Sequence, residues 1–77
     1  MTQRHTIELT ESELIVLNAV LDRLEGRDDF ETLVPDQADR QAIHNLVCLL
    51  ERVDPIVVAG NYDEQLALAR DQVLSEP

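Results

Sequence analysis

The chain has no tryptophan and no lysine, and it carries only one phenylalanine, one tyrosine and one cysteine among 77 residues. The lack of large aromatic side chains excludes a core built around them. Any core must instead be aliphatic, and 12 Leu, 8 Val and 4 Ile are available for it. Such a core is held together by many small contacts between neighbouring elements.

A single cysteine, Cys48, excludes an internal disulfide. Small secreted domains more often carry several disulfides, so this composition favours a reducing compartment. The first six residues, Met-Thr-Gln-Arg-His-Thr, contain no apolar run typical of a signal peptide, and no apolar stretch is long enough to span a bilayer. The sequence therefore predicts a cytoplasmic protein without membrane association.

Positive charge is scarce: the chain has 16 Asp and Glu residues but six Arg, which gives a formal net charge of −10. This charge repels nucleic-acid phosphates and anionic lipid surfaces, so nucleic acid is an unlikely partner. It suits solubility or a basic protein partner.

The short chain limits how much surface folding can bury. Residues 1–77 are expected to form a single domain. A domain of this size buries only about 60% of its unfolded surface. A second chain is a natural source of further burial, so self-association is expected.

The first helix is predicted over 10–26, after an N-terminal arm over 1–9. Thr10 and Glu13 form a capping-box pair, and Gly26 follows as a stop signal. One broad apolar face carries Leu14, Leu17, Val20, Leu21 and Leu24. By the same helical spacing, Ile15 and Ala19 fall outside this face and Asn18 lies opposite it.

Two further helices are predicted after a connector over 27–35. One spans 36–54, capped by Asp36 and stopped by Pro55, with a wide apolar stripe. A turn over 55–60 leads to the last helix, over 61–75. The fold class is therefore all-α: a small bundle of three main helices with short connecting turns and a possible short extended segment at 6–9. The stripe of the second of these helices comprises Ala42, Ile43, Leu46, Val47, Leu49, Leu50 and Val53, and the face of the last comprises Tyr62, Leu66, Ala69 and Val73.

His44 and Cys48 are four residues apart, so they project from the same helix face, with Glu51 following. Imidazole, thiolate and carboxylate are zinc ligands, and a neighbouring Cys and His can also form a nucleophilic dyad. However, the face is otherwise polar, and no second Cys or His cluster completes a ligand set. We therefore expect no metal, no cofactor and no catalytic residues.

Two short stretches resemble DNA-binding families. The segment Thr6-Ile7-Glu8-Leu9, followed by a capped helix, resembles the opening of ribbon-helix-helix repressors, in which a strand pairs across a dimer. The pattern Leu9-Thr10-x-x-Glu13-x-x-Val16-Leu17 is similar to the first helix of many helix-turn-helix regulators. Either resemblance implies a nucleic-acid-binding regulator. The basic residues needed to follow a phosphate backbone are sparse, since only Arg4 in the segment suits DNA.

Several apolar residues remain outside the predicted core faces. We interpret them as a possible interface for a partner or a second copy. The sequence therefore favours a small acidic interaction or regulatory protein that is homodimeric and not an enzyme. One alternative is an acidic inhibitor that mimics phosphate and covers a basic protein surface, and a second is the nucleic-acid-binding regulator. The interface candidates are Ile15, Val16, Ala19, Val57, Val58 and Leu68.

Overall fold

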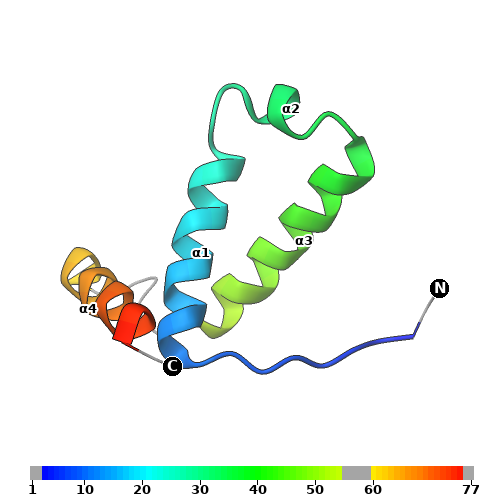
Figure 1. Ribbon diagram of the computed structural model, residues 1–77. Helices are drawn as coiled ribbons and strands as arrows, with labels where there is room; N and C mark the ends of the chain where they lie inside the picture. Colours follow the sequence, from blue (N-terminus) through cyan, green and yellow to red (C-terminus); the bar gives the residue numbers. More distant parts are fainter. Residues whose placement is uncertain (1–2, 55–59, 76–77) are drawn as a thin grey trace.

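The computed structural model describes residues 3–54 and 60–75, and four helices make up most of this part of the chain (Figure 1). Three of the helices are long and the other is a single turn, with no strand among the described residues. The prediction of an all-helical fold built on three main helices is confirmed. The helices are α1 (Glu11–Glu25), α2 (Phe30–Leu33), α3 (Gln37–Val53) and α4 (Tyr62–Ser75).

The first helix, α1, begins at the predicted capping box. The Glu13 backbone N–H donates to the Thr10 hydroxyl oxygen at 3.1 Å, and the Thr10 N–H donates to Glu13 Oε1 at 3.0 Å. These bonds satisfy donors that a helix start otherwise leaves unpaired. At the other end, the Gly26 N–H donates to the Asp22 carbonyl at 3.1 Å. The helix therefore begins and ends where the sequence places its signals.

The connector between α1 and α3 is more ordered than predicted. The Arg27 guanidinium donates twice to the Asp29 carboxylate, at 2.8 and 2.9 Å, which closes the turn before α2. This hydrogen bond holds the pKa of Asp29 below its usual range. The following residues form the one-turn helix α2, in which Phe30 is buried and Leu33 is exposed. A helix of only four residues is too short for apolar periodicity to reveal, so the sequence did not predict α2.

The longest helix, α3, starts and stops for local reasons. The Asp36 carboxylate accepts from the Ala38 N–H at 2.8 Å, as an N-cap does. At the far end Asp54 has an extended backbone with ψ of 118°. The residue before a proline is driven towards this region, so the helix ends at Val53. The predicted turn over 55–60 lies mostly outside the described residues.

The first helix lies at the centre of the arrangement. Both α3 and α4 pack against α1, from different sides (Figure 1). In this view α1 and α3 lie closest at their lower ends and diverge towards α2, while α4 crosses beside the lower half of α1. One helix of 15 residues therefore supplies a packing surface to two others.

The contact between α1 and α4 corrects the predicted face of α1. Ile15 and Ala19, which helical spacing placed outside the core, are buried there against Leu66 and Ala69. Ala19 and Ala69 contribute two small side chains to this cluster. Conversely, Val20 of the predicted core face is 46% exposed. The prediction is wrong because it assigned α1 one apolar face, whereas the helix has packing partners on two sides.

Asn18 is also buried, although the sequence placed it opposite the core. Its side-chain N–H donates to Asp54 Oδ2 at 2.7 Å. Both side chains are over nine-tenths buried, so this charge-assisted bond lies in a region of low dielectric. It joins the middle of α1 to the last residue before Pro55, and so sets how α3 lies against α1.

The molecule is more open than a compact monomer of its mass. Its accessible surface is 6225 Å², whereas about 4700 Å² is typical of a folded 8.7 kDa chain. Its radius of gyration is 13.9 Å, against about 11.5 Å for a compact domain of this length. The divergence of α1 and α3 and the extended arm account for this difference.

The packing predicts unequal sensitivity at two aliphatic positions of α1. Ile15→Val should lower the free energy of unfolding by about 1 kcal/mol because it removes a buried methyl group. Val20→Ala should change it by less than about 0.5 kcal/mol because the side chain is half exposed. Urea unfolding followed by circular dichroism at one protein concentration measures both. A larger loss for Val20→Ala would contradict the packing of α4 on α1.

The bond between Asn18 and Asp54 predicts a pH-dependent variant. Asn18→Asp would set two buried carboxyl groups together, and like charges so close cannot both ionise. One carboxyl of the variant pair therefore has a higher pKa folded than unfolded, so the variant loses stability as pH rises above about 4. We expect a loss of about 2–3 kcal/mol at pH 7 relative to wild type, and a smaller loss at pH 4.

The matched control for this variant is Asn45→Asp, which adds the same charge at an exposed position of α3. Urea unfolding of both variants and the wild type at pH 4, 5 and 7 gives the comparison. Equal pH dependence for the two variants would show that burial of the Asn18 site has no effect.

Candidate functional site

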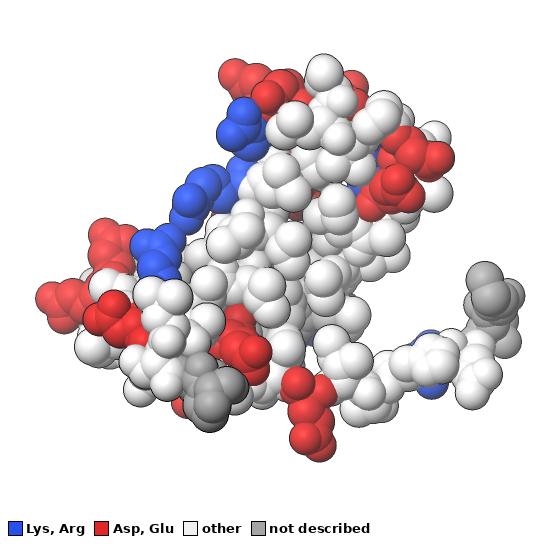
Figure 2. Space-filling model, viewed as in Figure 1, with Lys and Arg blue, Asp and Glu red and all other residues white. Residues whose placement is uncertain are grey.

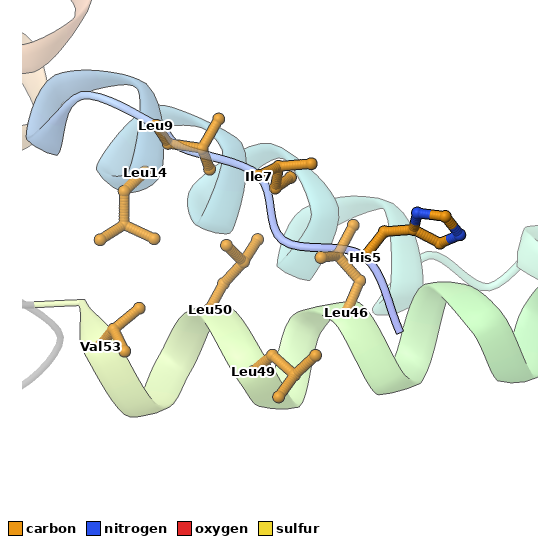
Figure 3. Close-up of a pocket in the computed structure, with 8 residues that line it drawn as sticks. All are labelled: His5, Ile7, Leu9, Leu14, Leu46, Leu49, Leu50 and Val53. Atoms are coloured by element: carbon orange, nitrogen blue, oxygen red, sulfur yellow. The ribbon is translucent and has the colours of Figure 1, made fainter. Parts of the chain in front are cut away.

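An apolar groove lies between the N-terminal arm and α3, and the start of α1 closes it on a third side (Figure 3). Its volume is about 540 Å³. Seven of the eight lining side chains are aliphatic, which makes the groove a surface for apolar partners. We call it the arm–α3 groove, and its lining residues are His5, Ile7, Leu9, Leu14, Leu46, Leu49, Leu50 and Val53.

The arm contributes every second residue to this groove. His5, Ile7 and Leu9 line it, whereas Arg4, Thr6 and Glu8 do not. This period of two is that of an extended chain, as the sequence predicted for 6–9. Within the described part of the chain, no hydrogen bond or ion pair ties residues 3–9 to the body. Because no neighbouring strand is available there, the arm is extended without forming a sheet.

The α3 side of the groove comes from an apolar stripe wider than α1 can cover. Val47 and Leu50 are buried towards α1. The rest of the stripe stays open: Leu46 is 40%, Leu49 is 56% and Val53 is 63% exposed. The predicted face of the second helix is therefore present, but the chain itself buries only one edge of it.

The groove is free of carboxylates in a strongly acidic chain. None of the lining residues is Asp or Glu, although the chain contains 16 of them. In the view of Figure 2, carboxylates gather near α2, over α4 and at the lower middle where the arm joins the body, and uncharged atoms cover the middle of the face. Another chain can therefore approach the groove without burying a negative charge.

The polar face of α3 brings together the residues that the sequence singled out for chemistry. His44 Nδ1 lies 3.0 Å from Glu25 Oε2, and Cys48 Sγ lies 3.6 Å from His44 Nε2. The carboxylate beside the imidazole thus comes from the end of α1, and the sequence named Glu51 of α3 instead. A proton on Nδ1 would be donated to Glu25, which would leave Nε2 able to accept from the thiol.

A shallow hollow lies beside this polar cluster. The neighbouring hollow of about 330 Å³ is lined by His44 and Glu25 but not by Cys48. A thiol nucleophile would need a substrate held against it. Among residues 3–54 and 60–75, no group of three or more His, Cys, Asp or Glu side chains could hold a metal ion.

The predicted interface residues are scattered in the structure. Ile15 and Ala19 are buried between α1 and α4, so they offer no surface to a partner. Val16 packs against the same cluster, and Leu68 is exposed on α4. Val57 and Val58 lie outside the described residues.

Sequence reasoning missed the exposed residues of the groove. It assigned Leu46, Leu49 and Val53 to the core, because a helical stripe does not reveal how much of its width a single neighbour covers.

No protein-family model, curated protein or solved structure matches this chain. In the described part of the chain, none of the helices combines the length and apolarity required to cross a bilayer.

Proposed function

We propose that this is a small, non-catalytic interaction protein that works by binding another polypeptide through the arm–α3 groove. The observation that carries the proposal is a continuous aliphatic surface, without carboxylates, on a chain whose net charge is −10. Scattered exposed aliphatic residues are ordinary on any protein, but a groove lined almost only by them marks an association surface.

The energetics favour occupation of this groove. Covering the open side chains of α3 and Ile7 would remove apolar surface from water, which is worth about 25 cal/mol per Å². This gain in free energy matters because the core of the chain itself is small. It is offset in part by the cost of ordering the arm, since each fixed backbone residue loses about 1–2 kcal/mol of conformational entropy.

A polypeptide suits the groove better than the other classes of partner. Its lining offers only one polar side chain, His5, with which to orient a small polar ligand. The net charge opposes nucleic acid. A regulatory role, and the alternative in which the acidic surface covers a basic protein, stay predictions.

The proposal predicts that one side chain of the groove is needed to capture a partner. A tagged full-length chain is produced in its source cells beside an untagged copy, and captured polypeptides are identified by mass spectrometry. Leu49→Glu would place a charge in the groove and should reduce capture at least tenfold. Leu68→Glu is the matched control, because Leu68 on α4 is 57% exposed and Leu49 is 56% exposed.

Capture by the wild type and Leu68→Glu, but not by Leu49→Glu, supports the proposal. Equal capture by all three proteins would show that the groove is not the binding surface. If association weakened with salt equally in all three, the acidic exterior would be the binding surface instead.

A further inference from the structure

We propose that the polypeptide in the arm–α3 groove is a second copy of this chain, with the two α3 helices packed antiparallel about a two-fold axis. This inference rests on the proposed function and names the partner of the same groove. In such a dimer each copy presents the same surface to the other, so one self-complementary face is sufficient.

The spacing on α3 provides such a face. Ala42, Leu46, Leu49 and Val53 follow one another at intervals of four, three and four residues, and all are exposed. This is the a and d spacing at which two helices interlock their side chains. We call these four residues the outer seam.

A second row of residues lies beside the outer seam, shifted by one residue along the sequence. Ile43, Val47, Leu50 and Asp54 have the same spacing, and they are buried or half-buried. One helix therefore carries two adjacent seams, of which the chain itself uses only one.

Charge favours the antiparallel orientation. Asp36 and Asp39 lie at the N-terminal end of α3, whereas Glu51 and Arg52 lie next to each other in its last turn. Parallel helices would set Asp39 beside its symmetry mate, and like charges placed side by side repel. Antiparallel helices move the two Asp39 side chains to opposite ends of the pair, and also oppose the helix dipoles.

The molecule leaves more surface open than a compact monomer does, and aliphatic side chains of the outer seam are part of that surface. The molecule exposes about 1500 Å² more than a compact chain of its mass. A stable interface needs about 800 Å² from each partner. Leu46, Leu49 and Val53 of the outer seam line the same groove as Ile7 (74% exposed) and Leu9 of the arm, so a second copy seated there would cover aliphatic side chains of both elements.

Light scattering after size-exclusion chromatography tests the dimer in the purified full chain. The wild type and Leu68→Glu should have twice the mass of 8.7 kDa at micromolar concentration. Leu49→Glu should be monomeric there, with a dimer dissociation constant raised at least 100-fold. Far-ultraviolet circular dichroism shows whether each variant keeps its helices. If Leu49→Glu were unfolded, Leu49→Ala, which adds no charge, would be expected to raise the dissociation constant by about tenfold.

A monomeric wild type, or a dimer unchanged by Leu49→Glu, would overturn the inference. The capture experiment separates this failure from that of the proposed function. A different polypeptide captured through Leu49 would leave the function standing with another partner, whereas no capture through Leu49 would remove both.

Disulfide cross-linking tests the orientation. In a Cys48→Ser background, Leu49→Cys lies close to the proposed two-fold axis and should cross-link between copies on oxidation. Ala42→Cys should not, because antiparallel packing separates the two copies of this residue by roughly 16 Å along the helix axis and a disulfide needs Cα atoms within about 7 Å. Efficient cross-linking at both positions would indicate parallel helices, and so would overturn the antiparallel arrangement.

Discussion

The structure depends on the packing of α1 against two helices at once. Its 15 residues pack against α4 on one side and α3 on the other, and the described helices gather around this shared element. A helix is only about 10–12 Å across, so two partners occupy most of its surface. Among the described helices, α1 and the single turn of α2 leave part of the apolar surface of α3 and α4 exposed. The open groove is thus a consequence of building a bundle around a single central helix.

The buried bond between Asn18 and Asp54 gives this arrangement its specificity. Aliphatic side chains can slide past one another with small changes in energy, because their attraction has no preferred direction. A charge-assisted hydrogen bond at 2.7 Å holds only in one geometry. It fixes the lower end of α3 against the middle of α1, while the upper ends diverge towards α2 (Figure 1).

The sequence predicts the local features well, since their causes are local. Thr10 with Glu13, and Asp36 with Ala38, place the starts of two helices through contacts within four residues. It is harder to predict which residues of one helix are packed against another helix. Ile15 and Asn18 were placed outside because an apolar stripe shows which residues prefer burial, but not how many neighbours a helix has. The same limit applies to α3, where one stripe divides into a buried row and an open one.

The division of α3 into two rows bears directly on function. A helix row that is exposed to water leaves little apolar surface unburied in a monomer if its residues are small or polar. Leu46, Leu49 and Val53 are neither, and they line a groove that has no carboxylate among its lining side chains. If the chain acted alone, acidic side chains at these positions would improve solubility at no cost to the buried row of Val47 and Leu50. Large aliphatic side chains at the spacing that lets helices interlock are the reason why we propose that this surface is covered, and the same surface on a second copy has the matching spacing.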